Sequence, residues 1–131
     1  MFASDQAWIP PVGVLFVRIL LAPWEHVVEF GYVHEQKPIT TSFHYYTLAR
    51  IRNWRAEPLF GGMLDCGVGE TGKTDAGGAI VRRVADRDDV DALRKLWGDR
   101  RMTFAEWCED ACSRPELGDA SKAMLRKQEK K

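Results

Sequence analysis

Residues 26–34 read HVVEFGYVH, and residues 39–47 read ITTSFHYYT. In the first segment Val28, Phe30 and Tyr32 fall on one face and Val27, Glu29 and Val33 on the other, with the period of two that is typical of a β-strand. The second segment is rich in threonine and tyrosine, which favour strands, and the polar turn at 35–38 contains a proline. The two segments therefore predict an antiparallel β-hairpin, around which the rest of the fold is organised.

Apolar segments on either side of the hairpin predict further strands. Residues 13–21 read GVLFVRILL, a strand-length run of β-branched and large apolar residues that ends before Pro23, although a helix is also compatible with it. Residues 48–55 read LARIRNWR and fit either an extension of the second hairpin strand or the start of a helix. The segment 79–85, AIVRRVA, is a further short strand.

The last third of the chain carries helix signals. Residues 86–97 begin with aspartates, repeat apolar residues at helical spacing and are followed by Gly98. Thr103 and Glu106 form a capping box that predicts a second helix starting at Phe104. We expect an α+β fold in which a small antiparallel sheet from the N-terminal half is packed by a C-terminal αα-hairpin, the whole chain 1–131 forming a single domain.

Three segments are expected to lie outside this core. Residues 1–11 form an N-terminal arm that ends in two prolines. Residues 61–78 form a glycine-rich loop that joins the two halves of the chain. Residues 116–131 form a charged C-terminal tail, ending RKQEKK, which we expect to fray into solvent.

The composition describes an ordinary globular protein. Hydrophobic residues make up 45% of 131 residues, and 19 basic residues balance 19 acidic ones, so no overall charge attracts nucleic acid or an anionic membrane. The three cysteines do not form a secreted framework and favour a reducing compartment. With no signal peptide or membrane span evident, we expect an intracellular protein of the cytoplasm or an organelle interior.

The glycine-rich loop contains a phosphate-loop pattern. Gly67, Gly72, Lys73 and Thr74 satisfy G-x-x-x-x-G-K-[ST], whose backbone N–H groups cradle phosphates in nucleotide-binding enzymes. Working sites place a buried strand before the first glycine and a helix after the lysine. Here glycines occupy both flanks, so the interpretation as a plain glycine loop is favoured over a nucleotide site.

No metal site or cofactor site is expected. The three histidines, His26, His34 and His44, lie on the predicted hairpin, but His26 and His34 are about 26 Å apart along one strand and cannot share a metal. Cys108 and Cys112 lie on one helical face together with aromatic residues, so we interpret them as small core residues.

A strip of aromatic and basic residues is the candidate binding surface. If 39–54 is one regular strand, a single face carries His44, Tyr46, Arg50, Arg52 and Trp54. Such a face suits a protein interface, since Trp, Tyr and Arg dominate binding hot spots, and also suits stacking of single-stranded nucleic acid. The first interpretation to weigh against both is that these aromatics are simply core residues, as strand aromatics usually are.

The sequence favours a non-catalytic protein-interaction module, an inhibitor, an adaptor or an accessory subunit of a larger assembly. The short chain has five tryptophans and no credible catalytic constellation. A single-stranded nucleic-acid binder that uses residues 44–54 is the alternative, and a nucleotide-binding enzyme that uses residues 67–74 is third.

Overall fold

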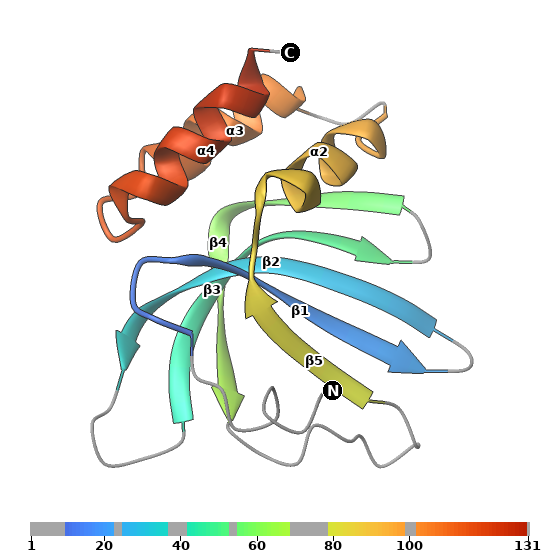
Figure 1. Ribbon diagram of the computed structural model, residues 1–131, viewed down its shortest axis with the longest axis vertical. Coiled ribbons are helices and arrows are strands. Elements are labelled where there is room, and N and C mark those ends of the chain that lie inside the picture. The colour runs from blue at the N-terminus through green and yellow to red at the C-terminus, as the bar shows by residue number, and fades with distance from the viewer. Residues whose placement is uncertain are drawn as a thin grey trace.

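The fold is built on one five-stranded antiparallel sheet. The structure, a computed structural model, describes residues 10–22, 25–36, 42–52, 55–68, 79–98 and 102–130. The strands are β1 (Leu15–Ala22), β2 (Glu25–Gln36), β3 (Ser42–Arg52), β4 (Arg55–Val68) and β5 (Ala79–Val84). Their order across the sheet is β4-β3-β2-β1-β5 (Figure 1).

The predicted hairpin is confirmed as β2 and β3. Their register pairs Val27 with Arg52 at one end and Gln36 with Phe43 at the other. The ambiguous segment after residue 47 continues β3 as a strand. The predicted strands at 13–21 and 79–85 correspond to β1 and β5, which pair with each other along the side of β1 that β2 leaves free.

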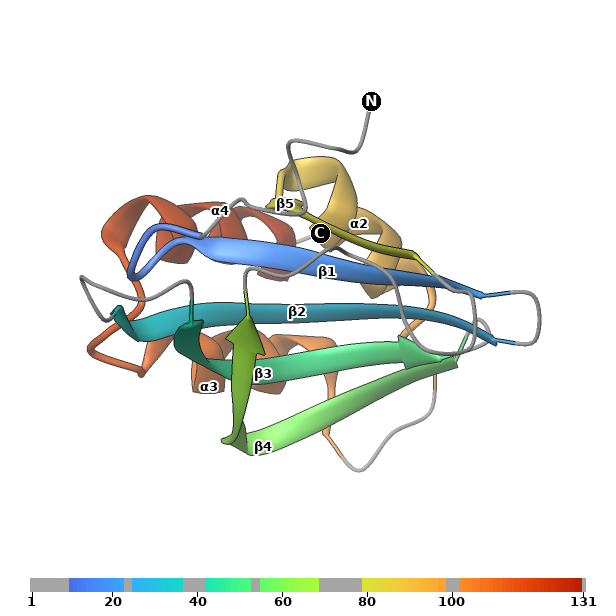
Figure 2. The ribbon, with the colours of Figure 1, turned by 90° about the horizontal axis from the view of Figure 1, so that it is seen from below.

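The two faces of the sheet have different characters. On β1 and β2, Leu15, Val17, Phe30 and Tyr32 alternate onto one face and join the core with the helices. The three helices of the described residues all lie on this side, which we call the helix-covered face (Figure 2). On the opposite face, a smaller buried cluster contains Phe16, Val33 and Tyr45.

A β-bulge interrupts the alternation of β3 at Leu48. The register of β3 with β2 shifts between Phe30 and Gly31, and its register with β4 shifts on either side of Leu48. A Cβ on Gly31 would stand 2.4 Å from the Tyr46 carbonyl oxygen, so the close approach of the strands there requires glycine. The indole N–H of Trp107 donates to the Leu48 carbonyl at 2.8 Å and satisfies this buried backbone group.

The first two helices begin where their caps predict. Helix α2 (Arg87–Lys95) starts after a capping box of Asp86 and Asp89, and α3 (Phe104–Cys112) starts after the capping box of Thr103 and Glu106. Trp97, just beyond α2, packs against Phe104 and Trp107 with ring centroids 5.5 and 5.6 Å apart. The α+β fold, an antiparallel sheet packed by helices in one small domain, is confirmed.

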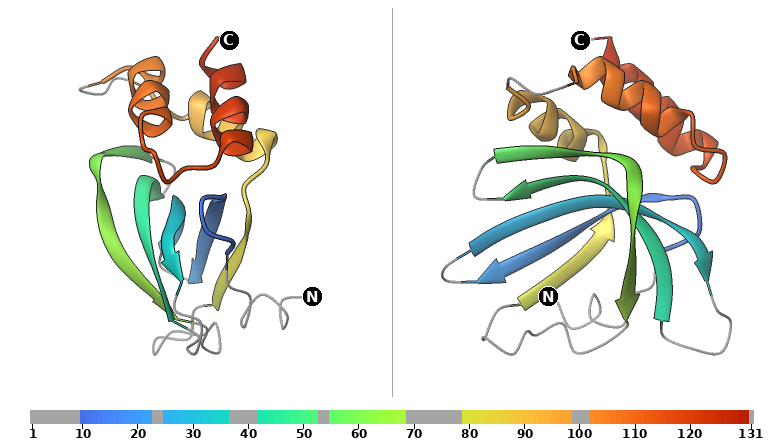
Figure 3. Two further views of the ribbon diagram at one scale, coloured as in Figure 1. Left: turned by 90° about the vertical axis from the view of Figure 1, so that its left-hand side faces the viewer. Right: turned by 180° about the vertical axis from the view of Figure 1, so that it is seen from behind.

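The prediction of a fraying C-terminal tail is wrong. Helix α4 (Asp119–Glu129) packs against both α2 and α3 (Figure 3), so the helical layer has three members. Its inner side is a sparse stripe of fully or nearly buried residues, which are Ser121, Leu125 and Gln128, and Leu117 is buried just before the helix begins. These three residues, with Leu117 beside them, are enough to dock the helix, although charged residues dominate the composition of residues 116–131.

The prediction of a loop over residues 61–78 is wrong for its first part. Residues 61–68 belong to β4, and the rest of that segment lies outside the described residues. Opposite the Leu48 bulge, the pairing of β4 jumps from Pro58 to Met63, and β4 bends sharply at that point (Figure 1). Glycines at 61 and 62 suit such a bend because they tolerate unusual backbone angles. Of the predicted N-terminal arm, only Pro10 and Pro11 are described, without regular structure.

Candidate functional site

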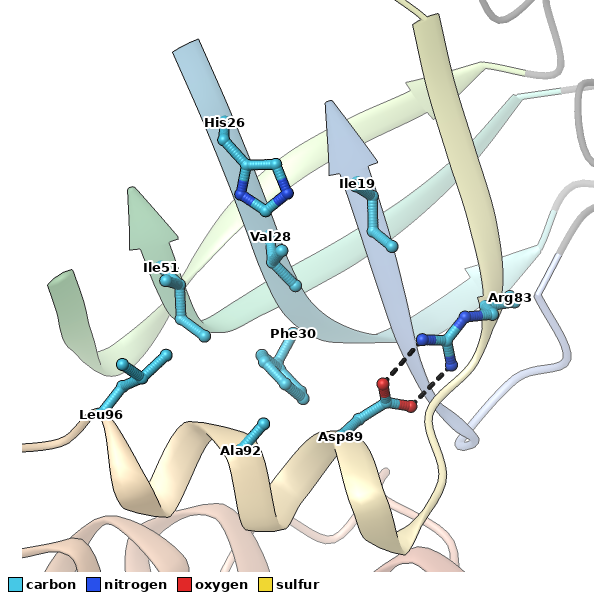
Figure 4. Close-up of a pocket in the computed structure, with 9 residues that line it drawn as sticks. All are labelled: Ile19, His26, Val28, Phe30, Ile51, Arg83, Asp89, Ala92 and Leu96. Carbon is cyan, nitrogen blue, oxygen red and sulfur yellow. Dashed lines mark hydrogen bonds and ion pairs between the residues drawn. The ribbon is translucent and has the colours of Figure 1, made fainter. Parts of the chain in front are cut away.

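An apolar pocket lies between α2 and the strands of the helix-covered face. Its volume is about 200 Å³. The residues that line it are Ile19, His26, Val28, Phe30, Ile51, Arg83, Asp89, Ala92 and Leu96 (Figure 4). Six of the nine side chains are apolar. These six come from β1, β2 and β3 on one side, and from α2 and its C-cap residue Leu96 on the other.

The pocket exists because the helical layer is shorter than the sheet. Helix α2 has nine residues and is about 14 Å long, whereas the twelve residues of β2 extend over about 40 Å. The strands therefore continue beyond α2, as Figure 4 shows for the ends that carry Ile19, His26 and Val28. Phe30 is fully buried at the base of the pocket, while Ile19 and Val28 are only partly buried.

One wall of the pocket is fixed by an ion pair between β5 and α2. The Arg83 guanidinium donates to both carboxylate oxygens of Asp89 at 2.6 and 2.7 Å. Asp89 also accepts from the backbone N–H of Asp86 at 2.8 Å, so one carboxylate caps α2 and ties it to the sheet. Burial acts to raise the pKa of the Asp89 carboxyl, but these hydrogen bonds outweigh it and hold the pKa below its ordinary value.

The predicted strip does not form a single face. Tyr46 lies on the helix-covered face, where its ring centroid is 5.5 Å from that of Tyr32 and 4.8 Å from that of His34. Arg50 lies on the opposite face, bound to Glu29. The bulge at Leu48 is the reason, because one extra residue reverses the side on which every later side chain of β3 points.

The remaining members of the strip are placed less fully. The backbone of His44 pairs with Glu35 of β2 and Cys66 of β4, and the described residues give no position for its side chain. Arg52 is exposed near the end of β3. Trp54 lies outside the described residues. The structure therefore brings Tyr46 together with aromatic residues of β2, and separates it from Arg50.

A row of charged residues crosses the opposite face. Arg18 donates to one oxygen of Glu29 at 2.6 Å, and Arg50 donates to the other at 2.9 Å. The strand register places these three residues directly side by side on β1, β2 and β3, and continues the row to Arg82 of β5. Glu29 is 5% exposed, so its two arginine partners compensate the cost of burying its charge.

The phosphate-loop pattern is only partly described. Gly67 lies in β4 opposite Phe43, so a strand does lead into the pattern, contrary to the expectation that none would. Gly72, Lys73 and Thr74 lie outside the described residues. The next described element is again a strand, β5, which begins at Ala79, five residues after Thr74.

Cysteine and histidine side chains behave as packing groups where they are described. Cys108 and Cys112 are buried free thiols in the core beneath α3, as expected. Burial raises the pKa of the Cys108 thiol to about 12, and nearby acidic groups act in the same direction. His26 and His34 lie on β2 of the predicted hairpin and are half-buried. Within the described ranges, no group of three His, Cys, Asp or Glu side chains is arranged to hold a metal ion.

The pocket was not predicted from the sequence, although one signal for it was present. Asp89, Ala92 and Leu96 follow one another at i, i+3 and i+7 on α2, beside the buried stripe of that helix.

None of the helices in the described part of the chain is both long enough and apolar enough to cross a membrane. Comparison of the chain with protein-family models, with curated proteins and with solved structures finds no match.

Proposed function

We propose that the chain is a non-catalytic protein-interaction module, an inhibitor, adaptor or accessory subunit, which docks its partner at the pocket beside α2. The observation that carries this proposal is the apolar area of the helix-covered face that α2 leaves uncovered. Half-buried Ile19, Val28 and Leu96 surround a cavity that a single apolar side chain could occupy. Anchors of this kind, buried in a pocket with a polar rim, dominate the affinity of protein interfaces.

The size of the pocket supports a side chain over a cofactor. Cofactor and drug-sized sites occupy about 300 to 1,000 Å³, whereas this cavity has about 200 Å³. An apolar cavity of about 150 Å³ is sufficient for benzene, so the pocket suits one aromatic or branched aliphatic group. Its polar groups at the Arg83 and Asp89 wall are already bonded to each other, which leaves an apolar surface for the occupant.

Single-stranded nucleic-acid binding by residues 44–54 is not proposed. That hypothesis needs aromatic rings and arginines side by side, whereas Tyr46 and Arg50 lie on opposite faces of the sheet. An intracellular reducing compartment remains part of the proposal, and the free thiols of Cys108 and Cys112 support it.

The proposal is tested by blocking the pocket at one exposed residue. Ala92→Arg places a long charged side chain at its mouth, and Ala105→Arg makes the same change at an exposed position of α3 away from it. Both variants should keep the wild-type melting temperature. The immobilised wild type and the Ala105→Arg variant should recover the same stoichiometric partner from the native source, and Ala92→Arg should lose it. Equal recovery by all three proteins would contradict docking at the pocket.

A further inference from the structure

The exposed side of α2 next to the pocket carries opposite charges at its two ends. Asp88, Ala92 and Lys95 follow at i, i+4 and i+7, so they form one ridge along the helix. All three are exposed, and the side chain of Lys95 has 68% of its surface accessible. The ridge is thus acidic at its start, small and apolar in the middle, and basic at its end.

We propose that the protein which docks at the pocket is a second copy of this chain, with the two α2 helices antiparallel about a twofold axis near Ala92. The inference rests on the proposed function and names its partner. A twofold axis at the middle of the ridge places Asp88 opposite Lys95 of the second copy, and repeats the same pair on the other side. The ridge is therefore complementary to its own inverted copy.

The spacing along α2 fits this arrangement. Asp88 and Lys95 are seven residues apart, about 10 Å along the helix, and the point halfway between them falls between Asp91 and Ala92. A small side chain at the crossing point allows two helices to approach closely. On the same helix, Lys95 contacts Asp91 at 3.0 Å, and its ammonium group has further donors for a carboxylate of the second copy.

The apolar surface beside the ridge supplies the attraction. Leu96 and the strand residues Ile19 and Val28 are half-buried in the single chain and lie on the pocket side of α2. Pairing through the ridges brings the two pockets to the same interface, where an apolar side chain of one copy can enter the pocket of the other. The charge pairs then determine the antiparallel orientation, as charged rims determine register at other interfaces.

The test uses charge reversal and its rescue. We expect sedimentation equilibrium of the full chain, up to about 0.5 mM, to show a reversible monomer–dimer equilibrium. By symmetry, Asp88→Lys or Lys95→Glu alone puts two like-charge pairs into the interface and should raise the dissociation constant at least about tenfold. An equimolar mixture of the two variants restores both opposite-charge pairs and should dimerise about as well as the wild type.

Three outcomes would overturn the homodimer. They are a wild type that stays monomeric at the highest concentration, a dimer that neither single reversal weakens, and a mixture that fails to recover association. Circular dichroism of each variant excludes unfolding as the cause of lost association. If the wild type is monomeric and the Ala92→Arg variant still loses a captured protein, the second copy is rejected while docking at the pocket stands.

Discussion

Gln128 is the strongest candidate for a single substitution that stabilises the protein. Its side chain is fully buried on the inner stripe of α4, and within the part of the chain that the structure describes neither its amide nitrogen nor its amide oxygen has a hydrogen-bond partner. A buried amide without a partner costs about 1 to 3 kcal/mol, because it gives up its bonds to water without replacement. Gln128→Met removes both polar atoms and keeps an unbranched side chain of similar length and helix propensity.

The expected gain is about 1 to 2 kcal/mol in the free energy of unfolding, after a small allowance for imperfect packing of the new side chain. For 131 residues, an unfolding entropy of about 2.1 cal/mol/K per residue converts this gain into a rise of about 4 to 7 °C in melting temperature. Urea unfolding followed by the fluorescence of buried Trp97 and Trp107 measures the same quantity independently.

Two control variants separate the effect of the amide from general repacking. Ser121, two turns earlier on the same stripe, accepts the backbone N–H of Leu15 at 3.0 Å. Ser121→Ala leaves that buried donor unsatisfied and should destabilise the protein by about 1 to 2 kcal/mol. Gln128→Glu buries a charge and should destabilise it further. If Gln128→Met is no more stable than the wild type at an unchanged urea dependence, the reasoning about the buried amide is refuted.

Three further predictions follow from contacts in the sheet, the pocket wall and the core. Gly31→Ala forces a Cβ against the Tyr46 carbonyl oxygen and should destabilise the protein by about 2 to 3 kcal/mol in urea unfolding. Asp89→Asn should cost about 1 to 2 kcal/mol at pH 7, a range that allows for the 45% exposure of its partner Arg83. The folded pKa of Asp89 is depressed, so its contribution to stability is present above the unfolded pKa and is lost as pH falls through the folded pKa. The difference in stability between Asp89→Asn and the wild type should therefore shrink as pH falls below the ordinary aspartate pKa of about 4. Cys108 should resist alkylation by iodoacetamide at pH 8 in the native protein, because burial raises the pKa of its thiol to about 12.

Each of these predictions has an internal comparison. Among the described residues no atom lies within 4 Å of a Cβ on Gly98, so Gly98→Ala should cost about 1 kcal/mol for its positive φ of 59°, less than Gly31→Ala. Asp88→Asn removes an exposed carboxylate and should lose much less stability at pH 7 than Asp89→Asn. Cys108 should react fully once the chain is unfolded in urea. Equal losses of stability for Gly31→Ala and Gly98→Ala would contradict the contact of Gly31, and equal losses for Asp89→Asn and Asp88→Asn would contradict the contacts of Asp89. Rapid alkylation of native Cys108 would contradict the burial of its thiol.

Local signals predicted the elements whose causes are local. The β2 and β3 hairpin follows from alternation and turn residues, and both capping boxes fix helix starts within four residues of sequence. Helix α4 was missed because charge was weighed over pattern, although Leu117, Ser121, Leu125 and Gln128 recur at helical spacing. The strand character of residues 61–68 was missed because glycines discourage strands locally, while pairing with β3 stabilises this one.

The bulge at Leu48 could not have been predicted from β3 alone. It depends on the missing side chain of Gly31 in the neighbouring strand and on the indole of Trp107, which is 59 residues away in the sequence. Such contacts exist only once the strands and α3 are assembled. A strict period of two along β3 therefore placed Tyr46 and Arg50 on one face. The one extra residue at the bulge turns every later side chain of the strip to the face opposite the predicted one.

The one-residue shift at the Leu48 bulge also determines where a binding surface can lie. Arg50 points away from the helices, and its guanidinium shares the Glu29 carboxylate with Arg18. These charged groups therefore bind one another within the sheet. With Tyr46 turned toward the helices, its ring becomes part of the aromatic packing with Tyr32 and His34. Both halves of the predicted strip are thus engaged in holding the fold, whereas α2 is too short to cover the strand ends beside it. Apolar surface that the chain leaves uncovered is what an interface requires, so the pocket and the ridge of α2 carry the proposed interaction in place of residues 44–54.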